Sequence, residues 1–437
     1  VLEETWQRYG IKMAVTEVHV NGPRETQMRW LKEVWDDAAR LKAKGADVCA
    51  VTIWALLGSF DWNSCCTQDT GFYESGVFDI RGDRPRPTAL AHMAKSLARE
   101  GKYEHPLLLQ PGWWKLPTRA MFARRDDLVL PEFKEGPPIL ITGATGTLGK
   151  AFARICQVRS INFRIVDRQE LDIADPQSVR SAIDRYQPWA VINCAGYVKV
   201  DEAEENSERC HRENVVGPET LALLTAQAGI KLLSFSSDMV FDGEQDSPYL
   251  ESHATAPVNA YGRSKAAAEE RILKANPRAL IVRTSSFFGP WDEHNFITQL
   301  MRRLSQGESV GVAADLIVSP TYVPDLVNAC LDLLVDDEKG IVHLTNRGAV
   351  SWADFAKLAF EIAGRHGPFQ GHLDGASIEH VSAGSVGWSA PRPRFSALAS
   401  SRANVLPSLE DALHRYFNEL EVALPKAPAA SLTGGAA

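Results

Sequence analysis

Two residues four positions apart, Tyr261 and Lys265, form the most specific chemical pattern in this chain. The stretch that follows, 266–274, is rich in helix formers, so both side chains lie on one face of a predicted helix. Tyrosine has an ordinary pKa of about 10, and a lysine cation one turn away would lower that pKa and ease proton donation. Ser237 follows the predicted strand 232–235, where a hydroxyl can orient and polarise a carbonyl. The set predicts protonation of a keto oxygen during hydride transfer, although an exposed Tyr/Lys pair is a common alternative for the spacing alone.

A glycine-rich loop upstream offers a place for the group that carries the hydride. The apolar run Ile139–Thr142 predicts a buried strand, and a helical pattern of apolar residues begins at Leu148. The G-x-x-G-x-x-G loop between them lets the backbone approach a pyrophosphate at a helix N-terminus. The alternative is a plain strand–helix turn. The predicted cofactor-binding residues of the loop are Gly143, Thr145, Gly146, Leu148 and Gly149.

The second predicted strand, 163–166, ends in Asp167 and Arg168. An acidic residue at this place commonly binds the adenosine ribose hydroxyls, whereas the neighbouring arginine could hold a 2′-phosphate. NADH and NADPH therefore both stay open. Asp172 and Ile173 are predicted to line the adenine pocket; alternatively, this segment caps the next helix.

Several motifs match one known family in the order of the chain. They are ILITGATGTLG, VINCAGYVKVDEAE, SSDMVFDG, APVNAYGRSK, VRTSSFFG and RPRFSALASS. Through them, residues 139 to about 420 resemble the dTDP-4-dehydrorhamnose reductase family of extended short-chain dehydrogenases. The resemblance implies NAD(P)H-dependent reduction of the C4 keto group of a nucleotide-linked deoxysugar, as in dTDP-L-rhamnose biosynthesis. It assigns carbonyl binding to Ser237, proton donation to Tyr261 and support of the tyrosine to Lys265. It adds to the cofactor site Asn193, Ala195, Gly196, Tyr197 and Asn214.

Two departures from the family pattern concern the expected sugar pocket, to which we assign Asp238, Met239 and Ser286. The family usually has a tyrosine where this chain has Met239, and often a tryptophan where it has Ser286. The pocket is thus less aromatic, and the identity of the sugar is open. A sugar dehydratase is disfavoured because such enzymes carry Asp-Glu where this chain has Asp238 and Met239. The alternative function is a non-catalytic nucleotide-binding regulatory or scaffold protein, against which the intact Ser, Tyr and Lys set argues.

The first 120 residues carry a different pattern. A strand at 13–19, a helix at 25–44 and a second strand at 48–57 resemble the last part of a glycoside hydrolase family 1 barrel, with Glu17 in the place of the nucleophile. Glycoside hydrolysis needs two carboxylates, and such a barrel needs eight strands. The Asn-Glu-Pro stretch of the family's second carboxylate is missing here. We therefore expect Glu17 to be vestigial and this region to be inactive, as the end of a longer polypeptide or a docking appendage.

The predicted architecture is α/β. A Rossmann-type doubly wound parallel sheet with a small C-terminal substrate-binding subdomain follows a partial (β/α) barrel fragment. The predicted parts are the glycoside-hydrolase-like fragment at 1–120, a charged linker at 121–136, the NAD(P)-binding reductase domain at 137–421 and a disordered Ala/Gly/Ser-rich tail at 422–437.

Composition excludes several other classes. The formal net charge of −8 over 437 residues argues against nucleic acid as a partner. The 7 cysteines are scattered and show no zinc spacing, which predicts free thiols, no metal site and a cytoplasmic location. No apolar run approaches the ~18 residues of a membrane span. The expected partner is a nucleotide-sugar substrate; a homodimer and a role for Mg²⁺ are left open.

Overall fold

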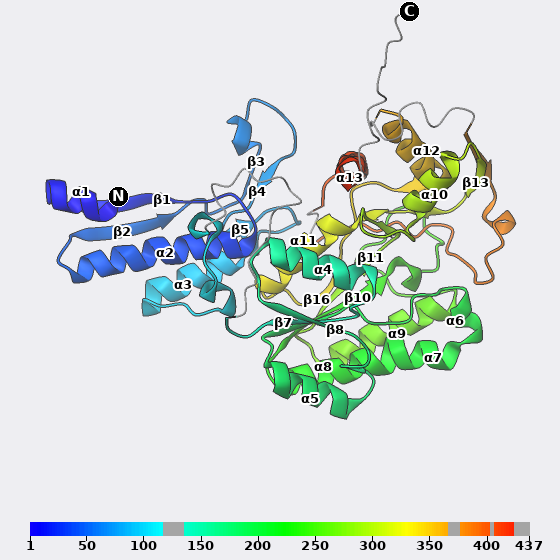
Figure 1. Ribbon diagram of the computed structural model, residues 1–437, viewed down its shortest axis with the longest axis horizontal. Helices are drawn as coiled ribbons and strands as arrows, with labels where there is room; N and C mark the ends of the chain where they lie inside the picture. The colour runs from blue at the N-terminus through cyan, green and yellow to red at the C-terminus, as the bar shows by residue number, and fades with distance from the viewer. Residues whose placement is uncertain (117–134, 366–375, 403–405, 424–437) are drawn as a thin grey trace, which may run out of the picture.

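The computed structural model describes residues 1–116, 135–365, 376–402 and 406–423. Nearly all of the linker predicted at 121–136 and of the tail predicted at 422–437 lies outside these residues, so the domain boundaries placed there stay predictions. A central sheet with helices on both faces carries an N-terminal unit on one side and a C-terminal subdomain at one end (Figure 1).

The central sheet has six strands in the order β16-β11-β10-β9-β7-β8, and every neighbouring pair is parallel. Its strands are short apolar runs because both faces are covered, as parallel sheets require. They are β7 (Ile139–Thr142), β8 (Phe163–Val166), β9 (Ala190–Asn193), β10 (Lys231–Ser237), β11 (Leu280–Thr284) and β16 (Gly340–His343).

Alternate residues of each strand pack on opposite faces of the sheet. Ile139 and Ile141 join one apolar cluster, which includes helices α4 (Thr147–Val158) and α11 (Val323–Val335). Leu140 joins the cluster on the other face, where Figure 1 shows the remaining helices below the sheet. Those helices are α5 (Pro176–Tyr186), α8 (Gly217–Gln227) and α9 (Ala260–Ala275).

The order of the strands fixes where a ligand can bind. From β7 the chain passes to β8 on one side, and it then returns to β9 on the other side. The crossovers diverge at this point and leave a crevice at the carboxyl ends of β7 and β9, where ligands of doubly wound sheets bind. The predicted doubly wound fold is confirmed.

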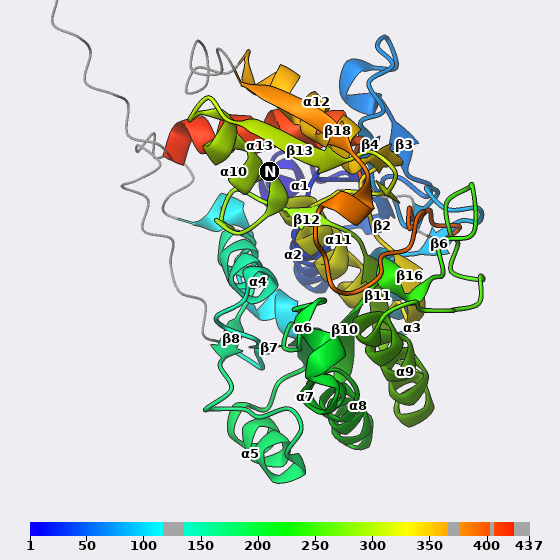
Figure 2. The same ribbon diagram turned by 90° about the vertical axis from the view of Figure 1, so that its right-hand side faces the viewer.

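The C-terminal subdomain has its own apolar core of aromatic side chains, among them Phe288, Phe355 and Tyr416. It lies over the carboxyl end of the sheet (Figure 2). Its elements are β12 (Phe287–Phe288), α10 (Phe296–Leu304), β13 (Ser309–Ala313), β14 (Ile317–Val318), β15 (Thr321–Tyr322), β17 (Val350–Ser351), α12 (Trp352–Ala363), β18 (Ser377–Val381) and α13 (Leu409–Ala423).

The N-terminal unit contains one parallel β-α-β repeat, as the sequence pattern indicates, in which β1 pairs with β2. Helices α2 and α3 lie beside α4 and α11 and share their apolar cluster (Figure 1). The elements of this unit are α1 (Leu2–Tyr9), β1 (Met13–Val18), α2 (Arg24–Ala43), β2 (Val48–Ile53), β3 (Ser59–Phe60), β4 (Tyr73–Glu74), β5 (Phe78–Asp79), β6 (Arg86–Pro87) and α3 (Ala89–Glu100).

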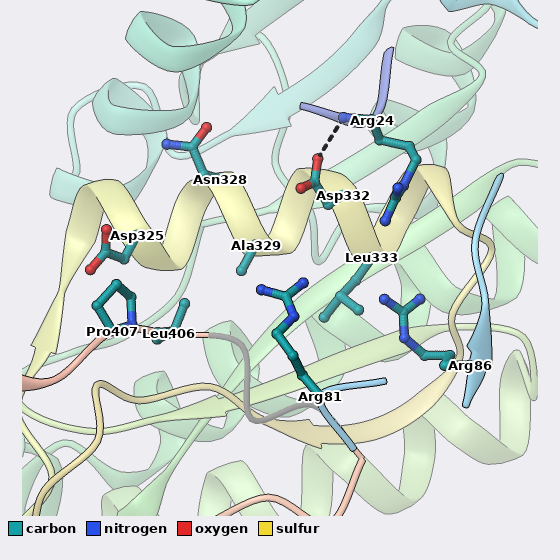
Figure 3. Close-up of a pocket in the computed structure, with 10 residues that line it drawn as sticks. All are labelled: Arg24, Arg81, Arg86, Asp325, Asn328, Ala329, Asp332, Leu333, Leu406 and Pro407. Atoms are coloured by element: carbon teal, nitrogen blue, oxygen red, sulfur yellow. Dashed lines mark hydrogen bonds between the residues drawn. The ribbon is translucent and has the colours of Figure 1, made fainter. Parts of the chain in front are cut away.

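Buried ion pairs join the N-terminal unit to the sheet domain. Arg24 of α2 contacts Asp336, just after α11, with its Nε 2.7 Å from the carboxylate. Arg159, just after α4, contacts Glu25 of α2 and lies 2.6 Å from Asp332 of α11. Figure 3 shows arginines of the N-terminal unit turned toward α11 around a cavity of about 190 Å³. Within the residues that the structure describes, no helix is long and apolar enough to cross a membrane.

Candidate active site

The predicted catalytic residues meet at the carboxyl end of β10. Ser237 is the last residue of that strand, and Tyr261 and Lys265 lie in the first turns of α9. The side chain of Asn259 caps α9 by accepting a hydrogen bond from Gly262 N at 2.7 Å, which fixes where the helix begins. Lys265 Nζ lies 5.7 Å from the centre of the Tyr261 ring and donates to the carbonyl of Phe235 at 3.2 Å.

The electrostatics of the tyrosine differ from the expectation. Burial raises the pKa of Tyr261 well above its ordinary value, and the nearby Asp238 carboxylate raises it further, while a hydrogen bond with Ser237 acts in the opposite direction. Burial lowers the pKa of Lys265 to about 8. The expected net lowering of the Tyr261 pKa is wrong for this structure, because desolvation disfavours the charged form of the buried phenol.

Asp238 is buried within a cage of serine hydroxyls. Ser237 donates to its Oδ1 at 2.9 Å, whereas Ser285 and Ser396 donate to its Oδ2 at 2.8 and 2.6 Å. Burial raises the pKa of the carboxyl, and the three hydrogen bonds oppose that rise. Sequence reasoning missed Ser285 and Ser396, because they belong to segments far from Asp238 along the chain.

A cleft of about 300 Å³ opens at the crevice between β7 and β9. Most of the predicted cofactor residues line it, from the glycine loop, the end of β8 and the segment after β9. These residues are Gly143, Thr145, Gly146, Asp167, Arg168, Asp172, Ile173, Ala195 and Gly196. Ala144, Leu171 and Cys194, which belong to the same predicted segments, also line the cleft. The sequence did not indicate four further lining residues: Ala174, Val198, Arg212 and Glu213.

The glycine loop has the form that a pyrophosphate requires. Gly143 has φ +80°, and a Cβ there would lie 2.7 Å from the carbonyl oxygen of Cys194. A Cβ at Gly149 would lie 2.2 Å from the carbonyl oxygen of Gly143. Gly146 begins α4 without a side-chain cap, which leaves N–H groups of the first turn for an anion. The loop therefore fits a dinucleotide.

The other predicted cofactor residues support the cleft from behind rather than line it. Asn193 accepts from Thr142 at 2.9 Å and ties the ends of β7 and β9 together. Asn214 accepts from the backbone N–H of Tyr197 at 2.7 Å, and Leu148 of α4 is partly buried and packs against the apolar cluster of that face. Asn214 lies in the π-helical segment Arg212–Val216.

Charged side chains gather where the adenosine ribose would lie. Arg168 lies 2.7 Å from Glu213, and Arg212 lies 2.7 Å from Asp172. Asp167 Oδ1 accepts a backbone hydrogen bond from Gln169 N at 2.8 Å, which holds the carboxylate at the end of β8. The alternative for this segment, a cap of the next helix, is also present: the side chain of Asp175 caps α5 by accepting from Gln177 N at 2.9 Å. Asp172 Oδ1 accepts from Ala174 N at 3.0 Å, before the helix begins.

Comparison with known proteins agrees with this geometry. Residues 138–422 match the family described as the RmlD substrate binding domain. The chain belongs to this family. It is 35% identical over 300 residues to the dTDP-4-dehydrorhamnose reductase of Mycolicibacterium smegmatis, over 67% of this chain and 86% of the relative. It is 34% identical over 262 residues to the dTDP-4-keto-6-deoxy-D-glucose reductase of Streptomyces niveus, over 59% of this chain and 87% of the relative.

A solved structure of the same family shows the same fold. The dTDP-4-dehydrorhamnose reductase of Bacillus anthracis, solved in complex with NADP, superposes with a TM-score of 0.60 at 32% identity. The match covers 65% of this chain and 99% of that protein. Because the family match begins at residue 138, the resemblance of residues 1–120 to a glycoside hydrolase barrel stays a prediction.

Within this RmlD-type site, the predicted sugar-binding residues surround the serine cage. Met239 N donates to Ser237 Oγ at 3.1 Å, and the Met239 sulfur lies 3.6 Å from Asn259 Nδ2. Ser286 has φ +40° and a hydroxyl 3.3 Å from that of Ser285. Both positions lie beside Asp238 as expected, and their direct contact with a sugar stays a prediction.

Glu17 lies apart from the RmlD-type site. It is exposed near the carboxyl end of β1 in the N-terminal unit. The nearby His19 ring lies 3.1 Å from the carboxylate of Glu74. Among the residues that the structure describes, no group of three or more His, Cys, Asp or Glu side chains is placed to hold a metal ion.

Proposed function

We propose that this chain reduces the C4 keto group of a dTDP-linked 4-keto-6-deoxyhexose, with dTDP-4-dehydrorhamnose as the first substrate to test. One observation carries the proposal: Ser237, Tyr261 and Lys265 lie together, and Lys265 Nζ lies 3.9 Å from where a Cβ on Gly196, a residue lining the dinucleotide cleft, would be. The named activities of the relatives from Mycolicibacterium smegmatis and Streptomyces niveus support it.

Tyr261 is the proposed proton donor. Its raised pKa keeps the phenol protonated near neutral pH, so the proton is present when the keto oxygen becomes an alkoxide. Lys265, with a pKa of about 8, is mostly a cation at pH 7 and stabilises the tyrosinate that remains. The proton moves from the Tyr261 oxygen to the substrate oxygen, and general acid catalysis of this kind contributes roughly 10²–10⁴-fold to the rate.

Ser237 is the proposed carbonyl-binding residue, and Asp238 governs its hydroxyl. The single hydroxyl proton of Ser237 is directed to Asp238 at 2.9 Å. As the substrate binds, the hydroxyl turns this proton toward the keto oxygen, and Asp238 keeps the hydrogen bonds from Ser285 and Ser396. The cage thus holds Ser237 in place without leaving the buried carboxylate unpartnered.

NADPH is the proposed cofactor, and it supplies the hydride when bound. The cleft places Arg168 and Arg212 at the ribose end. Their guanidinium groups could donate charge-assisted hydrogen bonds to a 2′-phosphate. The Bacillus anthracis relative was solved with NADP, which supports the same choice.

The test follows NADPH absorbance with dTDP-4-dehydrorhamnose, for the wild type, Tyr261→Phe and the exposed control Tyr9→Phe. We expect turnover by the wild type and the control, and a loss of roughly 10²–10⁴-fold in kcat for Tyr261→Phe. NADPH binding, followed by fluorescence, should be equal in all three. A wild type that binds NADPH but shows no turnover would contradict the proposal and favour the regulatory alternative.

A further inference from the structure

An exposed tryptophan lies in residues 382–394 of the C-terminal subdomain, a segment after β18 that joins neither of the apolar clusters on its two sides. Trp388 lies in this segment, and 38% of its surface is accessible. Figure 2 shows this segment, in orange, running from β18 toward the carboxyl end of the sheet near α6 (Glu202–Glu205).

Hydrogen bonds tie this segment to the mouth of the candidate active site. Ala390 N and Arg392 Nη2 each donate to Asp201 at 2.9 Å. Asp201 lies three residues after Val198, which lines the cofactor cleft. Asn259 Nδ2 donates to the carbonyl of Pro391 at 2.9 Å.

These hydrogen bonds place the segment beside α9, the helix that carries Tyr261 and Lys265. Asn259 is the cap of α9 and lies two residues before Tyr261. The same amide nitrogen lies 3.6 Å from the sulfur of Met239, a predicted sugar-binding residue. Trp388 therefore stands where the catalytic helix, the loop after β9 and the C-terminal subdomain meet.

The ring of Trp388 is held as a platform. The guanidinium carbon of Arg392 lies 5.3 Å from the centre of the ring, within the range of a cation–π contact. Arg392 is itself fixed by Asp201 and by its bond to the Ala390 carbonyl at 2.9 Å. The arginine is neutralised by Asp201, so the exposed part of the ring offers an apolar surface rather than a charged one.

We propose that Trp388 is the stacking platform for the nucleobase of the substrate. This inference rests on the proposed function, because it assumes a nucleotide-linked sugar. The hexose must reach the buried Ser237 and Tyr261, so the base is the end of the substrate that stays near the surface. Met239 and Ser286 leave the sugar end poor in aromatic contacts, and a flat base over Trp388 supplies stacking at the other end.

The test measures the affinity for dTDP, which has the base but no hexose, by calorimetry with NADPH present. Base–aromatic stacking lost on alanine substitution predicts on the order of tenfold weaker binding for Trp388→Ala, and less than threefold for Trp388→Phe. The control Trp113→Ala removes another exposed tryptophan, 55% accessible and outside this segment. It should bind dTDP as the wild type does.

Each outcome separates this inference from the proposed function. Unchanged dTDP affinity in Trp388→Ala overturns the platform, even if the wild type turns over. Weaker binding of the dTDP-hexose alone, with dTDP unaffected, places the hexose rather than the base on Trp388 and also overturns it. Tenfold weaker dTDP binding in a protein without turnover upholds the platform and contradicts the proposed reduction.

Discussion

The N-terminal unit and the RmlD-type region both place polar side chains at the carboxyl ends of parallel strands, yet only one builds a site. In the RmlD-type region, β7, β9 and β10 are adjacent, so the glycine loop and Ser237 converge on one crevice. In the described N-terminal unit, β1 pairs with β2 alone, and Glu17 stays exposed. A catalytic side chain at a strand end needs neighbouring strands to supply its partners.

We expect the two regions to differ most in how they tolerate alanine in place of a glycine, because the backbone is closely packed at the glycine loop. In Gly149→Ala the new Cβ would lie 2.2 Å from the carbonyl oxygen of Gly143, so the loop must shift away from the pyrophosphate. We expect NADPH binding to be lost in a fluorescence titration. Gly101→Ala in the N-terminal unit meets no atom within 4 Å and should cost only ~1–2 kcal/mol for its left-handed backbone, with NADPH binding retained. Full NADPH affinity in Gly149→Ala would show that the loop tolerates the side chain.

The buried ion pairs predict that the two regions are energetically coupled. Arg159→Met leaves the carboxylates of Glu25 and Asp332 without their shared cation. Removing one partner of a buried pair costs about 3–5 kcal/mol, which urea unfolding followed by circular dichroism would measure. The control Arg40→Ala removes exposed contacts to Glu3 and Asp37 and should change little. Equal unfolding curves for Arg159→Met and the wild type would mean that this ion-pair cluster adds no stability.

Much of the difference between the two regions could be predicted from the sequence, because the sequence patterns that build the site are local. The strand–glycine loop–helix pattern and the Tyr261/Lys265 spacing depend on residues within a few turns of one another. The serine cage could not be predicted, since Ser396 lies 158 positions from Asp238. The position of Arg212 could not be predicted either, because a π-helical segment brings it to the cleft. Such segments often occur at functional sites.

The misjudged pKa of Tyr261 has the same origin. Spacing on a helix indicates that Lys265 is near, but not that burial outweighs its charge. Nor does spacing show that the ammonium donates to the Phe235 carbonyl. Desolvation depends on every element packed around a group, so it is a property of the tertiary structure alone.

A smaller effect is expected in the pH dependence of the RmlD-type site. Lys265 has a pKa of about 8, so it loses its proton above that pH, and kcat/KM should fall roughly tenfold per pH unit there. Lys265→Arg keeps the cation, so its kcat/KM should not show this alkaline fall. A flat wild-type profile up to pH 10 would show that the reaction does not need the cation.

The same group has an opposite effect on stability. The folded pKa of Lys265 lies below its ordinary value of 10.5, so the unfolded chain binds more protons between about pH 8 and 10.5. The contribution of Lys265 to stability therefore rises with pH across this window. Urea midpoints of the wild type relative to Lys265→Met should diverge in that direction, with the wild type gaining as pH rises.

Glu17→Gln should have the smallest effect of all. Glu17 is exposed in the N-terminal unit, and a glycosidase needs a second carboxylate across the scissile bond, whereas the nearby Glu74 is engaged by His19 at 3.1 Å. We expect the kcat/KM of keto-sugar reduction and the urea midpoint of Glu17→Gln to equal those of the wild type, and neither protein to hydrolyse nitrophenyl glycosides. Hydrolysis by the wild type that is lost in Glu17→Gln would overturn the contrast between the two regions, because two strands would then suffice to position a working carboxylate.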